Sequence, residues 1–338
     1  MATALVTGIT GQDGGYLAER LVAEGWDVHG LVQARDGAAG AFSSRCPEVT
    51  LHEGNLADTG FTQSLIAELE PDEVYNLGGI SSVAFSWQHP ALTAEVTGVG
   101  AVGILEGCWL LQNATGRPVR VLQASSAEIF GRPVEVPQTE ATPVRPSTPY
   151  GAAKAYAHQM TGIYRDRGLA ASTVILYNHE SPRRPEAFVT RKITAAAARI
   201  SAGLQDTLSL GSLEVRRDWG WAPDYVDAMV RAVRRTASDS QAAESQAVDS
   251  PGGYVASDYV IATGQSHTVG EFVAAAFARA GVSDWQQRVQ LDPAFARPGD
   301  APEQRGDAGR ARTMLGWAPT KDFLDIVAAM VDADLAAL

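Results

Sequence analysis

The chain has 338 residues, of which 45% are hydrophobic and 20% charged, as in ordinary globular proteins with one large domain or two modest ones. Its formal net charge of -12 and its pI near 5.0 argue against a broad surface for nucleic acid or for an anionic membrane. We expect neither as a partner. Any bound anion must then be held by a local cluster of basic residues.

The positions of the cysteines and the first residues of the sequence indicate further what kind of protein this is. Cys46 and Cys108 are far apart and have no Cys or His near them at ligand spacing, so we expect buried thiols rather than a zinc site or a disulfide. The opening residues MATALVTG form an apolar strand pattern without a basic leader, and no run of about 18 apolar residues follows. We expect a cytoplasmic protein without a bound metal.

Short runs rich in β-branched residues alternate with longer segments in which apolar residues recur at helical spacing. This alternation predicts an α/β fold with a doubly wound parallel sheet. The expected strands are residues 3–8, 26–32, 49–55, 73–78, 119–126, 172–178 and 258–264. The expected helices are residues 13–24, 59–69, 91–112, 148–167 and 223–235.

After residue 265 the pattern changes to a helix, a short strand and two terminal helices, which indicates a smaller, mostly helical second domain. We predict a first domain from residues 1–178 and 218–265, and a second from residues 179–217 and 266–338. Residues 237–257 are rich in Ser, Ala, Gln and Gly without apolar periodicity, and we expect them to form a surface loop.

The first expected strand leads into TGITGQDGGYLAERL, where Gly8, Gly11 and Gly14 are spaced as GxxGxxG and a helix follows. The glycines allow a tight turn and a close approach of the backbone to a ligand. The helix N-terminus presents unpaired N–H groups to a pyrophosphate. The motif therefore predicts a dinucleotide cofactor, and a glycine-rich turn without a ligand is the alternative.

The end of the second strand indicates which dinucleotide binds. An acid that selects NAD is expected there, but residues 31–34 are Leu, Val, Gln and Ala, and Arg35 follows. This pattern favours the 2′-phosphate of NADP. Asp36 keeps open the alternative of a contact to ribose hydroxyls.

Two short motifs carry the expected chemistry. In QASSAEIFG, Ser126 and Glu128 are two residues apart at the end of an apolar strand, so they share a face if the strand continues. In PYGAAK, Tyr150 and Lys154 are four residues apart at the start of a helix and lie on one helical surface. An ammonium group beside a phenol lowers the pKa of the phenol, which gives a base for hydride transfer from an alcohol. A solvated surface pair is the alternative.

Together these motifs resemble those of the extended short-chain dehydrogenase/reductase superfamily and, within it, of the GDP-mannose 4,6-dehydratase family. The resemblance covers nearly the whole chain. It is carried by GITGQDGGYLAE, NLGGISSVAFSWQHPALTAEV, QASSAEIFG, YNHESPRRPEAFVTRKI, LGSLEVRRDWGWAPDYVDAM and DYVIATGQSHTVGEF. It implies that the first domain is an NADP-binding Rossmann domain and that the second binds a nucleotide sugar.

The resemblance also implies roles for individual residues. The catalytic residues are Ser126, Glu128, Tyr150 and Lys154. The residues implied to bind the cofactor are Gly8, Thr10, Gly11, Gln12, Asp13, Gly14, Arg35, Asn55, Leu56, Leu77, Gly78, Ser81, Tyr150, Lys154, His179 and Arg184. The residues implied to bind the substrate are Asn178, Val189, Arg191, Lys192, Gly211, Arg217, Arg297 and Asp300.

The stretch NHESPRRPEAFVTRK, residues 178–192, gathers four basic residues. The resemblance implies that they hold the phosphates of NADP and the diphosphate of GDP, which suit the forked guanidinium group. The alternative is that individual arginines pair with Glu180, Glu186 or Asp218.

The implied reaction converts GDP-mannose to GDP-4-keto-6-deoxy-mannose. Tyr150 takes the proton of the C4 hydroxyl while a hydride leaves C4 for NADP. Glu128 moves the C5 proton to the departing C6 hydroxyl, and the hydride returns to C6. The alternatives are a dehydratase or 4-epimerase acting on another nucleotide sugar, and a non-catalytic NADP-binding module. In either enzyme we expect a homodimer or a homotetramer.

The absence of an acid at residues 31–34 predicts that the protein binds NADP(H) more tightly than NAD(H), and that Arg35→Ala weakens this preference. Binding titrations with the two cofactors measure both effects. Equal affinity of the parent protein for NAD and NADP would contradict the prediction.

Overall fold

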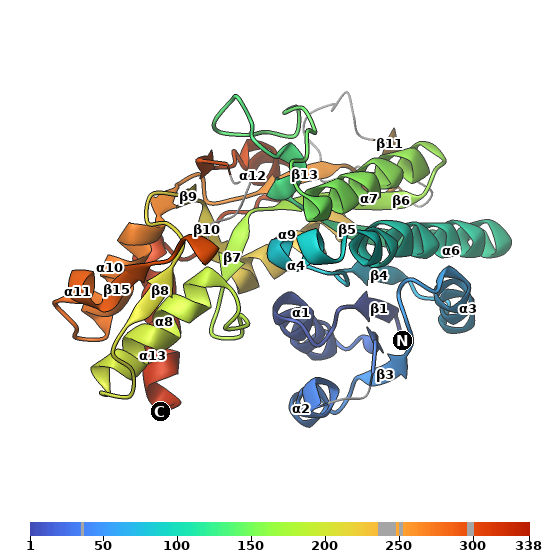
Figure 1. Ribbon diagram of the computed structural model, residues 1–338. Helices are drawn as coiled ribbons and strands as arrows, with labels where there is room; N and C mark the ends of the chain where they lie inside the picture. Colours follow the sequence, from blue (N-terminus) through green and yellow to red (C-terminus); the bar gives the residue numbers. More distant parts are fainter. Residues whose placement is uncertain (35–36, 236–247, 250–252, 296–300) are drawn as a thin grey trace.

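The computed structural model describes residues 1–34, 37–235, 248–249, 253–295 and 301–338 (Figure 1). At its centre is a seven-stranded sheet in the order β13-β6-β5-β4-β1-β2-β3, with every pair of neighbours parallel. The strands are β1 Thr3–Thr7, β2 Asp27–Val32, β3 Thr50–Glu53, β4 Glu73–Asn76, β5 Arg120–Ser126, β6 Ala170–Leu176 and β13 Asp258–Ile261.

Each of these seven strands coincides with a strand expected from the sequence, which confirms the α/β fold with a parallel sheet. The central strands are buried on both faces, because helices cover the two sides of the sheet. Alternate residues of β1 show this directly. Leu5 packs into one apolar cluster, whereas Ala4 and Val6 pack into another.

The helices form a layer on each face of the sheet. The cluster around Ala4 and Val6 includes side chains of α1 Gln12–Ala23, α2 Gly37–Arg45, α9 Ala222–Arg234 and α12 Gly309–Leu315. The cluster around Leu5 includes side chains of α3 Thr59–Leu69, α6 Gly100–Thr115 and α7 Pro149–Asp166. Cys46 and Cys108 are free thiols buried in these two clusters, as the sequence predicted.

The segment before α6 is also helical. It consists of α4 Val83–Gln88, α5 Pro90–Thr93 and the π-helix η1 Ala94–Val99, which runs on into α6. By length and composition, Pro90–Thr115 is apolar enough to cross a membrane, but more than half of its most apolar window is buried inside the fold. A helix packed in the core of a sheet protein meets the same criteria of length and composition, so these criteria alone do not indicate a membrane span.

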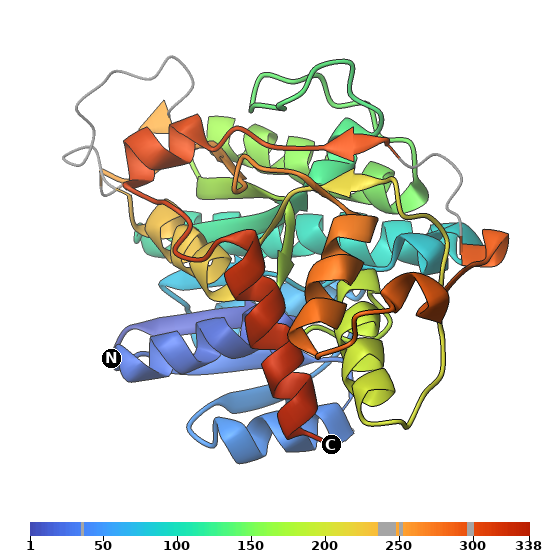
Figure 2. The same ribbon diagram turned by 90° about the vertical axis from the view of Figure 1, so that its left-hand side faces the viewer.

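A separate apolar cluster lies beside the sheet. It is built from α8 Val189–Ser201, β8 Leu208–Leu210, β10 Trp219–Trp221, α10 Val269–Arg279 and α13 Phe323–Ala336. Figure 2 shows α10 and α13 side by side in this region. Thr268 and Glu271 cap α10 reciprocally, and Asp322 and Asp325 do the same for α13, so both helices begin where the sequence supplies a capping box.

The described part of the chain also contains shorter elements. They are β7 Asn178–Glu180, β9 Arg216–Arg217, β11 Val248–Asp249, β12 Val255–Ala256, β14 His267–Thr268, α11 Trp285–Arg288, β15 Val289–Leu291 and β16 Glu303–Gln304, with the short 3-10 helices η2 Ala127–Phe130 and η4 Pro293–Phe295. The domain boundaries stay a prediction. Most of the expected loop 237–257 lies outside the described residues.

Two glycines in helices provide a test of the fold. A Cβ at Gly14 would lie 2.4 Å from the carbonyl oxygen of Gly8, whereas a Cβ at Gly162 in α7 would meet nothing within 4 Å. We expect Gly14→Ala to lower the free energy of unfolding by about 1–3 kcal/mol through overpacking. Gly162→Ala is expected to raise it by about 0.5–1 kcal/mol through helix propensity.

Denaturant unfolding of the two variants measures the difference. Equal stability of the two variants would show that the turn around Gly8 is looser than described.

Candidate active site

Two cavities lie at the carboxyl ends of the central strands, where binding sites of open parallel sheets are expected. The first has a volume of about 520 Å³ and the second of about 260 Å³. Both are lined by the segment after β4, with Gly78–Ile80 in the first and Leu77, Ser81 and Ser82 in the second. The two cavities therefore meet at one loop.

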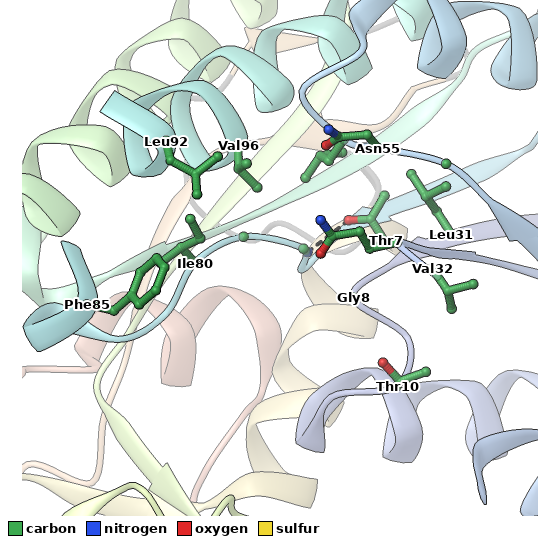
Figure 3. Close-up of a pocket in the computed structure, with 15 residues that line it drawn as sticks. Thr7, Gly8, Thr10, Leu31, Val32, Asn55, Ile80, Phe85, Leu92 and Val96 are labelled. Atoms are coloured by element: carbon green, nitrogen blue, oxygen red, sulfur yellow. Dashed lines mark hydrogen bonds between the residues drawn. The ribbon is translucent and has the colours of Figure 1, made fainter. Parts of the chain in front are cut away.

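The first cavity is a slot with apolar walls. Figure 3 shows Ile80 and Phe85 on one side and Leu31 and Val32 on the other. Polar groups come from the strand ends, and Asn55 lies at the rim near Leu31. The slot suits a flat ring with a polar edge, such as a nucleotide base.

The glycine turn lies at the bottom of this slot. Gly8 has a φ of +68°, and a Cβ there would lie 2.9 Å from the Cα of Gly78. The turn leads into α1, whose N-cap Gly11 has no side chain to bond the first N–H groups of the helix. Close backbone approach and a 12-residue helix without a side-chain cap at its N-terminus fit a pyrophosphate, so the residues present fit a dinucleotide.

A chain of buried polar side chains crosses the strand ends beneath the cavities. The Thr7 hydroxyl donates to Asn76 over 2.7 Å, and Asn76 Nδ2 donates to Gln123 over 2.8 Å. Gln123 Nε2 donates to the Ala124 carbonyl over 3.0 Å, and the Lys154 ammonium donates to the same carbonyl over 2.8 Å. The lysine is therefore fixed by the sheet itself.

The second cavity brings all four predicted catalytic residues together. Pro149 begins α7, and the Thr148 hydroxyl caps it by accepting from Gly151 N, which places Tyr150 in the first turn. Ser126 forms a side-chain hydrogen bond with Tyr150. A phenol, a hydroxyl and a carboxylate thus line one small cleft.

The local geometry of Ser126 and Glu128 differs from the expectation. The strand does not continue beyond Ser126, because η2 Ala127–Phe130 follows it. Instead the Ser126 hydroxyl accepts a hydrogen bond from Glu128 N over 3.3 Å and turns the chain. This turn, rather than strand alternation, puts both side chains in the cleft.

The expected lowering of the Tyr150 pKa does not occur in the protein on its own. Burial raises the pKa of Tyr150 to about 12, although the hydrogen bond with Ser126 acts in the opposite direction. Burial also lowers the pKa of Lys154 to about 8. The reason is that both groups are buried and that the ammonium is directed to the Ala124 carbonyl.

His179 and Asp13 join the glycine turn to β7. His179 Nε2 lies 2.8 Å from Asp13 Oδ2, and Nδ1 lies 2.7 Å from the Tyr177 carbonyl. Burial disfavours the charged imidazole, but Asp13 outweighs it and raises the pKa of His179. Burial likewise acts against the Asp13 carboxylate, yet His179 lowers the pKa of Asp13 overall. The ring also stacks on Tyr225 at 4.5 Å.

Several residues line the second cavity that the sequence did not assign to the site, and Glu180, named only as a possible arginine partner, is the most notable. It is buried, accepts from the Thr190 hydroxyl over 2.6 Å and lies 3.3 Å from Arg184 Nε. Burial raises the pKa of Glu180. Arg184 in turn lies over the Phe188 ring at 3.8 Å. The sequence suggested an arginine partner for Glu180 but not its place in the cavity, because that depends on how β7 lies against the following loop and α8.

The basic residues of the stretch 178–192 have different surroundings. Arg191 pairs with the buried Asp334 of α13, and Arg183 lies 2.8 Å from Glu19 of α1. Lys192 donates to the Ser209 carbonyl over 2.8 Å. Of the four, only Arg184 lines a cavity. The alternative left open by the sequence, pairing with Glu180, Glu186 or Asp218, therefore holds for Arg184, which lies 3.3 Å from Glu180, whereas Arg183 and Arg191 pair with acids that the sequence did not suggest.

Most of the predicted binding residues line one of the two cavities. Those at the first are Gly8, Thr10, Asn55, Leu56 and Gly78. Those at the second are Asp13, Leu77, Ser81, Tyr150, Lys154, Asn178, His179, Arg184, Val189 and Arg217.

The remaining predicted residues do not line either cavity or cannot be placed. Gly11, Gln12 and Gly14, in the glycine turn and in α1, do not line either cavity, and neither do Arg191, Lys192 and Gly211. Arg35, Arg297 and Asp300 fall outside the described residues. Within the described part of the chain, no group of three or more His, Cys, Asp or Glu is placed to hold a metal.

Comparison with known proteins gives a consistent result. Residues 5–330 match the model of the family described as GDP-mannose 4,6 dehydratase. GDP-mannose 4,6 dehydratase 1 of Arabidopsis thaliana is 41% identical over 342 residues, with 98% of this chain and 89% of the relative covered. GDP-mannose 4,6 dehydratase of Homo sapiens is 37% identical over 365 residues, with 98% of this chain and 91% of the relative covered.

Solved structures share the fold. UDP-glucose 4-epimerase of Thermus thermophilus, in complex with NAD, superposes with a TM-score of 0.80 at 26% identity, covering 99% of this chain and 100% of the other. RMD from Pseudomonas aeruginosa, complexed with NADPH, superposes with a TM-score of 0.76 at 22% identity, covering 99% and 100%. Structural neighbours of this chain thus bind NAD or NADPH.

The contrast between Arg191 and Arg217 can be tested. Arg217 lines the second cavity, whereas Arg191 is paired with Asp334. We expect Arg217→Ala to weaken the binding of GDP about ten- to a hundred-fold, through loss of charge-assisted bonds to the diphosphate. Arg191→Ala is expected to lower the melting temperature and leave GDP affinity unchanged, because it strands a buried carboxylate.

Calorimetric titration with GDP and thermal unfolding of both variants give the two readouts. If Arg191→Ala weakened GDP binding and left the melting temperature unchanged, Arg191 would be a substrate-binding residue, as the sequence first suggested.

Proposed function

The chain belongs to the GDP-mannose 4,6-dehydratase family, and we propose that it converts GDP-mannose to GDP-4-keto-6-deoxy-mannose by oxidation at C4, loss of water across C5 and C6, and reduction at C6. The observation that carries the mechanism is that Glu128 lines the same cleft as Tyr150 and Ser126. Hydride chemistry needs the tyrosine, and elimination needs a second base.

Tyr150 acts at C4. Its phenolate accepts the proton of the C4 hydroxyl, and Ser126 donates a hydrogen bond that favours the phenolate. When bound, an oxidised nicotinamide supplies the acceptor for the C4 hydride and later its donor to C6. Lys154 is held by the Ala124 carbonyl on the buried side of the cleft, and the cation whose charge acts against the effect of burial on Tyr150 is Arg184.

Glu128 acts at C5 and C6. A ketone at C4 acidifies the C5 proton, and the Glu128 carboxylate accepts it. The resulting carboxylic acid returns this proton to the C6 hydroxyl, which leaves as water and forms a C5–C6 double bond. Addition of hydride at C6 and of a proton at C5, balanced by release of the proton that Tyr150 took from the C4 hydroxyl, completes the reaction without net change in the cofactor.

The cations of the cleft suit the anionic end of the substrate. Arg217, together with Asn178 and Val189, lines the side of the cleft that β7, β9 and α8 form. We assign the diphosphate to this side, because the catalytic groups occupy the side formed by β5 and α7.

The finer cofactor assignment is NADP. It is supported by the lining of the first cavity at the end of β2, where Leu31, Val32 and Gln33 provide no carboxylate for a ribose 2′-hydroxyl.

We also propose a homo-oligomer. Large apolar side chains are exposed along η1, α6 and α7, namely Val99, Leu110, Tyr156 and Ile163. A second copy of the chain would cover this face. Singly exposed apolar side chains are common, but four along adjacent helices form a stripe.

Glu128 also separates this function from a 4-epimerase, which removes no proton from C5. Epimerisation leaves the mass of the nucleotide sugar unchanged, whereas dehydration lowers it by one water.

Variants of the two bases should stall at different steps. Tyr150→Phe cannot take the C4 proton, so the bound cofactor should stay oxidised after addition of GDP-mannose. Glu128→Gln keeps the tyrosine, so the cofactor should become reduced while elimination slows by about 10²- to 10⁴-fold. Single-turnover absorbance of the nicotinamide, followed by mass analysis of the sugar nucleotide, measures both steps.

Each variant serves as the control of the other. Dehydrated product formed at the parental rate by Glu128→Gln would remove Glu128 from the elimination step. If the parent protein did not reduce its bound cofactor after addition of GDP-mannose, the assignment of GDP-mannose as the substrate would be wrong.

A further inference from the structure

Gln304 is a buried glutamine beside the cleft that neither the motifs nor the proposed reaction accounts for. It lies in β16, which pairs in parallel with β9 so that Gln304 is opposite Arg217. Residues opposite each other in a paired register project from the same face of a sheet. Gln304 therefore shares a face with the arginine proposed to hold the diphosphate.

The backbone around Gln304 is firmly held. Its carbonyl accepts from Asp218 N over 3.0 Å. The next residue, Arg305, donates its N–H to the Gln138 side chain and accepts from Gln138 N over 2.9 Å. The Asp218 carboxylate accepts in turn from Thr263 and Gly264, so β9 and β16 are fixed to the loop that follows β13. The position of the Gln304 side chain is thus set by the fold.

That side chain reaches across the cleft wall to Glu128. Gln304 is only 4% exposed, and its Nε2 donates to Glu128 Oε1 at 3.4 Å. The distance is long, as expected for a catalytic contact before substrate closes the site. An amide N–H donates at every working pH, so the contact favours the ionised carboxylate over the acid.

We propose that Gln304 is a positioning residue for the elimination step, one that holds the Glu128 carboxylate ionised and oriented toward the substrate. This inference rests on the proposed function, in which Glu128 removes the C5 proton.

The same segment also touches the binding side of the cleft. Arg217 donates to the Ala301 carbonyl over 2.9 Å, three residues before Gln304. One short stretch, residues 301–304, thereby contacts both the proposed diphosphate ligand and the proposed base. Gln304 fixes the carboxylate relative to the end of the substrate that Arg217 anchors.

Other groups facing Glu128 set its electrostatic surroundings. Charge on Glu128 raises the pKa of Tyr150, so the two anions repel each other. Cations of the cleft offset this repulsion. The titratable and charged groups that line the cleft around Glu128 are Asp13 from α1, Tyr150 and Lys154 from α7, Tyr177 between β6 and β7, His179 and Glu180 from β7, Arg184 from the following loop and Arg217 from β9.

The test replaces the amide without changing the size of the side chain. We expect Gln304→Met to slow dehydration of GDP-mannose about ten-fold while C4 oxidation keeps its parental rate, so reduced cofactor accumulates in a single turnover. The acid limb of the kcat–pH profile should move up by about one pH unit, because the carboxylate loses a donor that favours its ionised form. Gln304→Glu, which adds a like charge, should enlarge both effects.

Gln112→Met is the matched control. Gln112 is also a buried glutamine, with Nε2 donating to the Gly168 carbonyl over 3.0 Å, but it lies in α6 away from the cleft. It should lose stability and keep the parental pH profile.

The outcomes separate the proposals. Gln304 variants with a parental pH profile and no accumulation of reduced cofactor would overturn the inference while the proposed function stands. Equal slowing of C4 oxidation and elimination would show a merely structural role and overturn it as well. A parent protein that does not reduce its cofactor with GDP-mannose would refute the proposed function, and the assignment of Gln304 would fail with it.

Discussion

In a parallel sheet the carboxyl ends of all strands lie along one edge. Polar groups buried at that edge must form hydrogen bonds with one another, since an unpaired buried donor or acceptor costs about 1–3 kcal/mol. In this protein these hydrogen bonds form a series that runs from the Thr7 hydroxyl through the side chains of Asn76 and Gln123 to the Ala124 carbonyl. That carbonyl also accepts from Lys154. The floor of the cofactor slot and the lysine beside the catalytic tyrosine are therefore parts of one hydrogen-bonded unit, and neither can shift without breaking bonds in the other.

The second feature of this edge is a cleft in which charged and titratable side chains such as Tyr150 and Lys154 are buried. Burial raises the pKa of Tyr150 to about 12 and lowers that of Lys154 to about 8, so each group resists its charged form. The protein opposes this cost with fixed partners, such as the hydrogen bond from Ser126 and the ion pair of Asp13 with His179. Charges that develop during hydride and proton transfer would meet preoriented groups rather than water.

The sequence predicted the sheet well because fully buried strands are continuous apolar runs. It also singled out the four residues that the second cavity brings together, because they lie in short motifs at strand and helix ends. It did not predict contacts made between distant segments. The pairing of Arg191 with Asp334 depends on how α8 packs against α13. Gln304 reaches Glu128 only because β16 pairs with β9. The prediction of a lowered pKa for Tyr150 was wrong for a similar reason, since burial, which a motif does not reveal, raises this pKa more than Ser126 and Arg184 lower it.

The central claim is that one hydrogen moves within a single sugar, from C4 to C6, while water is lost. GDP-mannose carrying deuterium at C4 tests it directly, with the product examined by mass and by the position of its label. The account predicts a product lighter by one water that retains the deuterium on C6. A product of unchanged mass, or a dehydrated product whose deuterium has been lost to solvent, would contradict it.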